Sequence, residues 1–507
     1  MDKQDEGASG LSGTDGEQGM TGDFYGPQKA ADIKKFFPVI FIAAIAAAVM
    51  FMRLRFISLP LDNDEGTYAY IANFMNSHYM PYRDIFDHKP PFIYFIYSAA
   101  MDLFGRDAYA IRFFAAVYVA AAAAAVFMAA SRIKGGFSKY AAALFFTACQ
   151  GSVMLQGINA NTETFLCLPL ALAAYFAAKG ADEKPFMLAS SGFMLGTACL
   201  IKETAAPVFI LVFIYMAVKK YPLKKMFFFT AGFILPFIFT ALWLAHEAIF
   251  TDFIKCGILY NFWYLTGGNT ARAGVDTRFF VQYGGLLIVS ILAAVAGKNK
   301  EGENIGLLIL SGMAAGIMLQ KGMWAHNYVG LCAPLALAAG FAIDRLSREG
   351  KKGMAAAVAA SVILLVLAVG PNLRYYSMDA LDVSATQFRT TRFAESRLMA
   401  ERINAVKKPG QTLFVYFAQP EIYFLTGIKA PGRYVNMFDW NAAYDEKGVN
   451  DELKAVYYSR PDYLVLYKKS LFTFASMLPY YRLEMQGDEL ELLVKKDDAA
   501  KKDAVKR

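Results

Sequence analysis

The sequence predicts a polytopic α-helical membrane protein with a small α/β domain after its last membrane helix. Three features predict this fold. Hydrophobic residues make up 56% of the 507 residues and charged residues 19%, a composition too apolar for an ordinary soluble domain. The apolar residues form long runs, and most basic residues lie in short clusters between those runs. From Asn372 onward the pattern changes to short strand-like and helix-like segments.

Apolar runs along the first 371 residues predict the membrane helices. A helix needs about 20 residues to cross a bilayer at right angles, and several runs are shorter. We expect eleven transmembrane helices, at 36–57, 108–131, 137–157, 164–178, 185–201, 204–218, 226–245, 278–297, 304–320, 327–343 and 353–371. The stretch 185–218 can also be divided differently.

The apolar segment 92–105 decides how the later loops are placed. It has about 13 residues, which is too short to span a bilayer comfortably. If it did cross, every later loop would change sides and the basic clusters would face outward. We therefore expect it to lie in the membrane interface or to dip in beside other helices.

The distribution of Lys and Arg predicts the orientation, because cytoplasmic loops hold the excess of basic residues. With the amino terminus inside, the inward loops contain Arg132, Lys134, Lys139, Lys179, Lys184, Lys219, Lys220, Lys224, Lys225, Lys298, Lys300, Arg345, Arg348, Lys351 and Lys352. The outward loops hold fewer basic residues. Arg53 and Arg55, near the outer end of the first helix, and the acid-rich amino-terminal segment count against this orientation. We expect an integral multi-pass protein of the cell (inner) membrane with a cytoplasmic amino terminus.

Four regions follow from this topology. Residues 1–33 are rich in Gly, Asp, Ser and Gln and have no apolar periodicity, so we expect a disordered cytoplasmic tail. Residues 34–371 form the transmembrane domain, in which 59–107 is the first outward loop. Residues 372–495 form an extracytoplasmic α/β domain, and 496–507 a disordered charged tail. In the α/β domain we expect helices at 392–407 and 450–459 and strands at 412–417, 463–467 and 489–494.

The first outward loop concentrates charge in a chain that is otherwise mostly apolar. Asp64 and Glu65 open a short helix, 66–75, that also carries Tyr68. One interpretation is that these acids cap the helix and favour its positive end. The other is that a carboxylate in a low-dielectric cleft at the membrane surface acts as a general base.

His88 and Lys89 precede two prolines that fit the first turn of an apolar helix. Lys89 either extends toward lipid headgroups or binds a phosphate at the interface as a compact point charge. Residues in later outward turns also have both a structural and a functional interpretation. Glu163 is either another residue at a helix start or a second carboxylate facing Asp64, and Lys202 either neutralises Glu203 or contacts phosphate.

The turn Trp324-Ala325-His326-Asn327-Tyr328 has two interpretations as well. Its Trp and Tyr are typical of an interfacial aromatic belt, whereas His326 is a candidate sugar or phosphate ligand. The candidate catalytic residues are thus Asp64, Glu65 and Glu163, and the candidate substrate or lipid-phosphate ligands are Tyr68, His88, Lys89, Lys202, Arg272 and His326.

Several motifs occur together in the order DEGTYAYIA, PYRDIFDHKPPFIYFIY, LFGRDAYAIRFFA, NANTETF, GTACLIKE and WAHNYVGLCAP. On these motifs, which cover most of 59–345, the sequence resembles the polyprenol-phosphate-sugar-dependent glycosyltransferases of the GT-C fold. It is similar to glycosyltransferase family 39, which includes protein O-mannosyltransferases and lipid A aminoarabinose transferases. Two departures are Asn327, which separates His326 from Tyr328 where relatives often have His followed by Tyr, and Glu163, where some relatives carry Asp.

The resemblance implies an inverting transfer on the outer face of the membrane. Asp64 would deprotonate the hydroxyl of a lipid, glycan or protein acceptor, which attacks the anomeric carbon of a sugar on a polyprenyl phosphate. The departing phosphate is a weak base that needs cationic stabilisation from Lys89, Lys202 or Arg272 rather than a general acid. A divalent metal, Mg²⁺ or Mn²⁺, between Asp64 and Glu163 is compatible with this chemistry, but no residue pattern demands a cofactor.

Other function classes fit the sequence less well. A transporter or lipid flippase is the main alternative, but it should place ionisable residues near mid-membrane on broken helices, and here they cluster at outward turns. A catalytically silent assembly subunit is a third interpretation. The net charge of +8 does not predict nucleic-acid binding, because the basic clusters are typical of topology-fixing loops. The five cysteines show no paired spacing for a disulfide or zinc site.

Overall fold

The computed structural model describes the chain except for residues 1–26, 183, 269–275, 297–299, 321 and 497–507. The contacts divide the chain into two units, Met1–Ala43 and Ala44–Arg507. The described part of the first unit is the beginning of helix α1 (Pro27–Leu54). The predicted tail 1–33 therefore lies mostly outside the described residues, and its last seven residues, 27–33, are helical. The following paragraphs concern the second unit.

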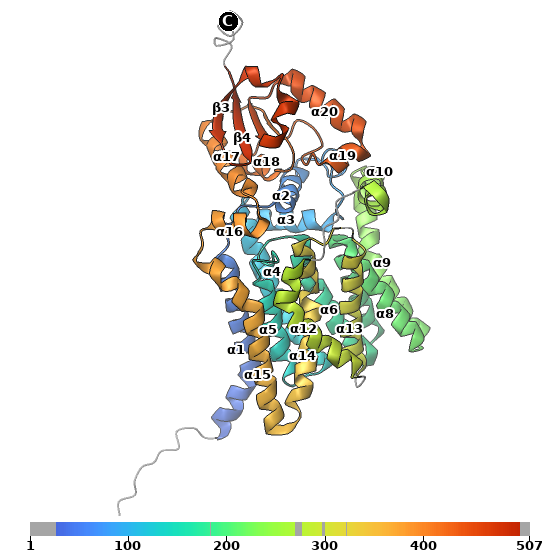
Figure 1. Cartoon of the computed structure of the whole chain (residues 1–507). Coiled ribbons are helices and arrows are strands. Elements are labelled where there is room, and N and C mark those ends of the chain that lie inside the picture. Colours follow the sequence, from blue (N-terminus) through green and yellow to red (C-terminus); the bar gives the residue numbers. More distant parts are fainter. Residues whose placement is uncertain (1–26, 183, 269–275, 297–299, 321, 497–507) are drawn as a thin grey trace, which may run out of the picture. The chain divides into compact units, whose positions relative to one another are not determined.

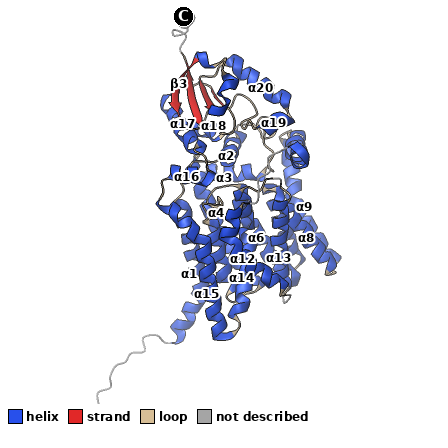
Figure 2. Ribbon diagram, viewed as in Figure 1, coloured by secondary structure: helices blue, strands red, loops and turns tan. Residues whose placement is uncertain are grey.

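Apolar helices of 13 to 28 residues match the eleven predicted runs in order. Their bounds are α1 (Pro27–Leu54), α4 (Ala108–Ile133), α5 (Ser138–Gln150), α6 (Thr162–Asp182), α7 (Pro185–Ile201), α8 (Ala206–Val218), α9 (Leu223–His246), α12 (Thr277–Val295), α13 (Glu301–Met318), α14 (Cys332–Ser347) and α15 (Gly350–Val369). Among the described residues, six stretches are long and apolar enough to cross a membrane, at 36–54, 108–133, 223–246, 277–295, 325–347 and 350–377. The predicted polytopic α-helical fold is confirmed (Figure 2).

Helices of at most 13 residues connect these eleven. They are α2 (Asn63–Met75), α3 (Phe92–Phe104), η1 (Glu203–Ala205), α10 (Phe250–Phe253), η2 (Ile254–Leu259), α11 (Tyr260–Trp263), η3 (Tyr264–Gly268), η4 (Ala325–Leu331) and η5 (Gly370–Ser377), of which η2 and η3 are π-helices. The predicted interfacial segment 92–105 corresponds to α3, which has 13 residues. Figure 1 shows α2 and α3 between the long helices and the strands.

Close helix packing in the bundle depends on small residues, as is usual between membrane helices. A Cβ atom on Gly192 of α7 would lie 2.0 Å from the backbone oxygen of Phe229 in α9. A Cβ atom on Gly232 of α9 would lie equally close to the oxygen of Ala189. The two helices can therefore touch backbone to backbone only because both positions are glycine.

Arg53 and Arg55 have structural partners that explain their place near the outer end of α1. The guanidinium of Arg53, which is 4% exposed, donates to the carbonyl oxygens of Gly157, Ile158 and Asn159 at 2.5, 3.0 and 3.1 Å. Arg55 donates to two carbonyl oxygens in 376–378. The carbonyls that Arg53 binds belong to the turns that follow α5, which ends at Gln150 although the apolar run continues to 157.

The small α/β domain predicted after the membrane helices is present. Its elements are α16 (Ala380–Phe388), α17 (Arg392–Val406), β1 (Leu413–Val415), α18 (Glu421–Thr426), α19 (Asp439–Tyr444), α20 (Glu446–Ser459), β2 (Tyr463–Tyr467), η6 (Lys468–Phe474), η7 (Leu478–Tyr480), β3 (Tyr481–Gln486) and β4 (Leu490–Lys495). The strand order is β1-β2-β4-β3, with β1 parallel to β2 and the other pairs antiparallel. A register shift between Leu483 and Met485 interrupts β3.

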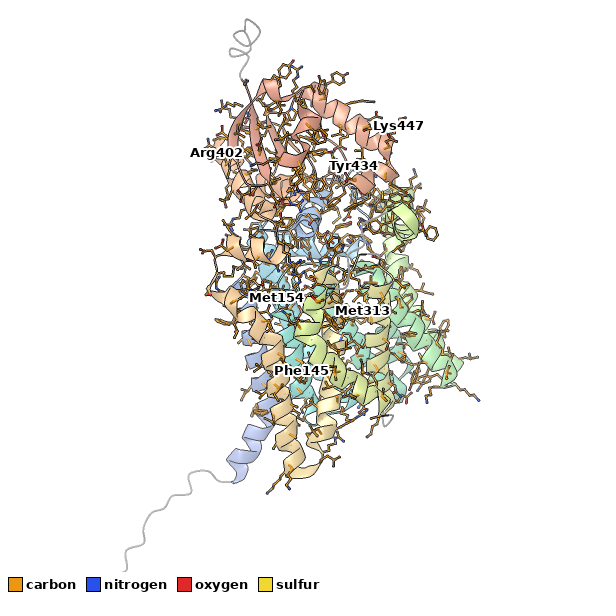
Figure 3. The ribbon with its side chains drawn as sticks, viewed as in Figure 1. Phe145, Met154, Met313, Arg402, Tyr434 and Lys447 are labelled. Atoms are coloured by element: carbon orange, nitrogen blue, oxygen red, sulfur yellow. The ribbon has the colours of Figure 1, made fainter. Side chains whose placement is uncertain are left out.

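The sheet-containing domain packs against the first outward loop rather than standing apart from it. Gly66 of α2 lies so close to α18 that an added Cβ would be 2.6 Å from the backbone nitrogen of Glu421. The hydroxyl of Tyr70 accepts a hydrogen bond from the Ala430 backbone at 2.9 Å. Figure 3 shows the side chains of Arg402, Tyr434 and Lys447 on this domain and those of Phe145 and Met313 among the long helices.

Candidate active site

A cavity of about 990 Å³ opens where loop 59–107, the ends of the long helices and the carboxy-terminal domain meet. It brings together residues from every outward turn that the sequence singled out, including Asp64, Tyr68, His88, Lys89, Gln156, Lys202, Glu203 and His326. The carboxy-terminal domain and its connection add 387–390, Arg392, Phe393, Asn436, Phe438, Trp440 and Asn441. These outward turns therefore lie at one end of the helices.

Three acids begin α2, and the structure gives them different surroundings. Asp62 is the N-cap: its side chain accepts a hydrogen bond from the backbone of Glu65 at 2.8 Å, and Glu65 accepts one from the backbone of Asp62 at 3.2 Å. This capping box satisfies two helix-end donors. Glu65 also forms an ion pair with Arg112 at 2.6 Å and has a fully buried side chain. Asp64 lies between Asp62 and Glu65 in the sequence. Its side chain is 31% exposed and lines the cavity.

Asp62 was absent from the predicted site, yet it holds two distant turns together. Its second carboxylate oxygen accepts hydrogen bonds from the side chains of Asn159 and Asn161 at 3.1 and 3.2 Å. Burial, together with the carboxylates of Glu65 and Asp64, raises the pKa of Asp62 well above its usual value. The loop before α2 is thus tied to the turn before α6, which carries Glu163.

His326 lies between the two predicted carboxylates. Its Nε2 atom is 3.9 Å from a carboxylate oxygen of Asp64 and 3.9 Å from one of Glu163. Its other ring nitrogen is 3.1 Å from the amide oxygen of Gln156. Asp64 and Glu163 therefore face a common imidazole rather than pairing directly.

Glu163 and Lys202 form a buried ion pair, and each side chain is 3% exposed. The Lys202 ammonium also donates to the side-chain oxygen of Asn327 at 3.0 Å, and Thr162 donates to Glu163 at 2.9 Å. One of the two predicted roles of Lys202 was to neutralise Glu203. Lys202 pairs with Glu163 instead. Asn327, which had appeared as a departure from the family motif, is the third member of the group.

Lys89 stands apart from these pairs. Among the residues that the structure describes, no carboxylate lies within ion-pair distance of its ammonium, and its side chain lines the cavity. Burial opposes protonation of Lys89, but the carboxylates of Asp64, Glu203 and Asp87 outweigh it and raise the pKa of the ammonium above its usual value. Lys89 therefore remains charged beside the cavity.

The neighbours of Lys89 fix the loop that carries it. The hydroxyl of Tyr82 donates to the Lys89 carbonyl at 2.8 Å. Asp87 accepts hydrogen bonds from the Tyr94 hydroxyl at 2.8 Å and the His88 backbone at 2.7 Å, and burial raises its pKa to about 6. The His88 ring stacks against Tyr264 with centroids 6.3 Å apart and planes at 19°.

Tyr68 lines the cavity from α2 and is 1% exposed. Its ring lies edge-on to Tyr97 at 5.6 Å. Within the described part of the chain, its buried hydroxyl has no hydrogen-bond partner. A buried hydroxyl without a partner is costly, which marks Tyr68 as a candidate ligand contact.

The predicted cation Arg272 lies outside the described residues. Arg278, a few residues later, lines the cavity and is paired with Asp276 through contacts of 2.9 and 2.5 Å. No sequence pattern selects Arg278, because its position at the start of a long apolar helix is typical of an interfacial anchor.

The donor set does not suit a divalent metal between the two predicted carboxylates. The Glu163 carboxylate is already neutralised by Lys202, which leaves Asp64 and the His326 imidazole as ligands. Hard cations such as Mg²⁺ prefer several oxygen ligands. Over the described ranges, no group of three or more His, Cys, Asp and Glu side chains has the geometry to hold a metal ion.

Comparisons with known proteins address the fold of the whole chain. The model of the dolichyl-phosphate-mannose-protein mannosyltransferase family matches residues 88–246. No curated protein matches the sequence.

Solved structures are similar over most of the chain. The crystal structure of ArnT from Cupriavidus metallidurans bound to undecaprenyl phosphate matches with a TM-score of 0.66 at 16% identity, over 91% of this chain and 99% of that one. The archaeal oligosaccharyltransferase AglB from Archaeoglobus fulgidus, in complex with an inhibitory peptide and a dolichol-phosphate, matches with a TM-score of 0.52 at 12% identity, over 87% and 70%. The chain therefore has the polytopic GT-C-like fold that its motifs predicted, and residues 88–246 match the model of the dolichyl-phosphate-mannose-protein mannosyltransferase family.

Proposed function

We propose that this chain is an inverting glycosyltransferase that moves a sugar from a polyprenyl-phosphate donor to a hydroxyl acceptor on the outer face of the inner membrane. One observation carries the proposal: a partly exposed carboxylate, Asp64, and an ammonium without an ion-pair partner among the described residues, Lys89, line one cavity. The undecaprenyl phosphate and dolichol-phosphate bound in the two similar structures support a lipid-linked donor.

The cavity is lined by both polar and apolar side chains, as a lipid-linked sugar requires. Ile210 of α8 and Leu319, just after α13, line it although they are 53% and 69% exposed. Apolar side chains exposed near the ends of membrane helices can contact a polyprenyl tail. The sugar and phosphate would then reach Asp64 and Lys89.

In the proposed reaction Asp64 accepts the proton of the acceptor hydroxyl while the oxygen bonds to the anomeric carbon. The bond from that carbon to the phosphate oxygen breaks, and its electron pair leaves with the polyprenyl phosphate. Lys89 stabilises the developing negative charge, as preorganised cations do in other group transfers. Attack from the face opposite the phosphate inverts the anomeric configuration. Since the metal ligands do not fit, no step passes through a metal.

The remaining candidates receive supporting roles. Glu65, one of the three predicted catalytic acids, is enclosed by Arg112 and the capping box, so we assign it to positioning Asp64. Glu163 positions the Lys202 ammonium through their ion pair. The imidazole of His326 lies near the carboxylates of Asp64 and Glu163 and helps to position both. Tyr68 and His88 contact the sugar or phosphate from the cavity wall.

A transporter remains the competing function, and the placement of ionisable groups argues against it. Asp64, Lys89, Lys202 and His326 meet at one cavity at the helix ends, rather than on broken helices at mid-membrane. The basic clusters support an arrangement in which this end and the carboxy-terminal domain face outward.

The test uses a deletion strain that is complemented with wild type, Asp64→Asn or the control Asp102→Asn. Asp102 is an exposed acid of α3 that does not line the cavity. Mass spectrometry of extracted lipids should show polyprenyl-phosphate sugar accumulating with Asp64→Asn but not with Asp102→Asn, at equal amounts of membrane protein. Normal donor consumption by Asp64→Asn would reject Asp64 as the base.

A further inference from the structure

Two parallel aromatic rings of the carboxy-terminal domain face the cavity. Phe438 and Trp440 have centroids 4.4 Å apart and planes at 16°, and both line the cavity while half-buried. We call this pair the aromatic wall. Phe417 supports Phe438 edge-on at 5.7 Å, and Tyr264 meets Trp440 edge-on at 6.5 Å. The wall is therefore held between two parts of the chain.

Hydrogen bonds fix the loop that carries the aromatic wall. The side chain of Asn441 donates to the backbone oxygen of Asn436 at 2.7 Å and accepts from the hydroxyl of Tyr260 at 2.9 Å. Asn441 is 3% exposed. Such a preorganised surface loses little conformational entropy when a ligand binds.

Two uncharged acceptor atoms complete this side of the cavity. Asn436 donates to Thr67 at 2.7 Å, and Gln387 donates to the Val153 carbonyl at 2.8 Å. Their amide oxygens are buried without a hydrogen-bond partner among the described residues, and both side chains line the cavity. An unpaired buried acceptor is costly unless a ligand supplies a donor.

Single contacts connect this side of the cavity to the neighbours of Asp64 and Lys89. Thr67, the partner of Asn436, lies one helical turn after Asp64 on α2, so the two share a face. Tyr264, the neighbour of Trp440, stacks on His88, the residue before Lys89. A ligand on the wall would therefore occupy the same cavity as the base.

We propose that the aromatic wall, with Asn436 and Gln387, is the acceptor subsite and that the acceptor is a neutral carbohydrate. This inference rests on the proposed transferase function. The flat aromatic surface suits the apolar C–H face of a sugar ring, and the two amide oxygens accept from its hydroxyl groups. An isoprenoid chain would leave both oxygens unpaired, and an anionic ligand would meet acceptors instead of donors.

The test measures binding to the full-length protein in lipid nanodiscs by saturation-transfer NMR. The probes are neutral oligosaccharides that end in glucose, galactose, mannose or N-acetylglucosamine, with a Ser/Thr-rich peptide as the competing class. We compare wild type, Trp440→Ala, Trp440→Phe, Asn436→Ala and the control Phe472→Ala. Phe472 is an aromatic residue of the same domain that is 81% exposed and outside the cavity lining.

We expect at least one oligosaccharide to bind wild type and Phe472→Ala equally. Trp440→Ala should weaken that binding about tenfold, Trp440→Phe should restore part of it, and Asn436→Ala should weaken it as well. Polyprenyl phosphate should bind Trp440→Ala as tightly as wild type, because the donor contacts are separate. If the wild type itself does not bind polyprenyl phosphate, the proposed function is rejected rather than the acceptor subsite.

Three results would overturn the acceptor subsite. One is that no oligosaccharide of the set binds wild type. Another is that Trp440→Ala binds the oligosaccharide as wild type does. The third is that the peptide binds and Trp440→Ala abolishes this binding, since the wall would then serve a protein acceptor.

Discussion

Lys202 and Glu163 form an ion pair although 39 residues separate them, and both side chains are 3% exposed. Asn327 accepts a further hydrogen bond from the same ammonium at 3.0 Å. Breaking a buried pair by removing one partner leaves an uncompensated charge, whereas replacing both partners can be neutral. The pair therefore has a testable structural role that is distinct from any contact with phosphate.

We predict that Lys202→Met and Glu163→Gln each destabilise the protein, by about 3 kcal/mol on the usual scale for buried pairs. The double variant should recover most of the loss, because neither charge is left alone. Thermal unfolding in detergent gives the three melting temperatures. Lys454→Met is the matched control, since its pair with Asp451 is 70% and 57% exposed and such surface pairs contribute little.

The same single and double variants separate an effect on stability from an effect on activity. If Lys202 also contacts the donor phosphate, the double variant should be stable but slow in sugar transfer. A double variant as unstable as the sum of the single variants would show that the two side chains do not act as a pair.

Lys89→Gln should weaken the binding of polyprenyl phosphate and lower the melting temperature less than Lys202→Met does. The Lys89 ammonium has no ion-pair partner among the described residues, so no direct contact is lost, although the carboxylates of Asp64, Glu203 and Asp87 favour its charged form. Microscale thermophoresis at two salt concentrations measures the effect, and the wild type should lose more affinity at high salt than the variant. Equal affinity of Lys89→Gln and wild type at low salt would remove Lys89 from the phosphate site.

Much of the fold could be predicted because its signals are local. The eleven apolar runs match helices in order, and strand 463–467 matches β2 (Tyr463–Tyr467) residue for residue. β3 (Tyr481–Gln486) was not predicted: it lies at the sheet edge and contains two charged residues, Arg482 and Glu484. Its residues do alternate between apolar and polar, as in a half-buried strand, so the signal for β3 was present in the sequence and was missed.

The roles of the site residues were harder to predict than their positions. The sequence favoured Asp64 and Glu65 together, but it cannot show that Arg112 encloses Glu65 or that Asn159 and Asn161 bind Asp62. These partners are 47 to 99 residues away, and nothing local marks them. Trp440 is still more distant in sequence, and its position at the cavity depends on the packing of the carboxy-terminal domain on α2.

Gly66→Ala tests that packing. A Cβ at position 66 would lie 2.6 Å from the Glu421 backbone nitrogen, so α18 must move away from α2. We expect a lower melting temperature, although alanine usually stabilises a helix by about 1 kcal/mol relative to glycine. Gly370→Ala is the control because an added Cβ there meets nothing within 4 Å. An unchanged melting temperature for Gly66→Ala would show that the domain packs more loosely on α2 than the structure indicates.

Glu421 should make this contact sensitive to pH. The side chain is 1% exposed, and burial raises its pKa from 4.5 to about 8, with Asp62 adding to the shift. An acid with a raised folded-state pKa binds more protons folded than unfolded, so stability falls as pH rises from about 4.5 to about 8. The slope from this group is at most about 1.4 kcal/mol per pH unit.

Glu421→Gln removes that titration while keeping the shape of the side chain. We expect the difference between the variant and wild type to be smallest below about pH 4, where Glu421 is protonated in both the folded and the unfolded protein, and the variant to melt at a higher temperature than wild type at pH 8.5. Thermal unfolding at half-unit pH steps measures the difference between the two proteins, which cancels the other titrating groups. A constant difference across the range would mean that Glu421 ionises in the folded protein as it does in the unfolded chain.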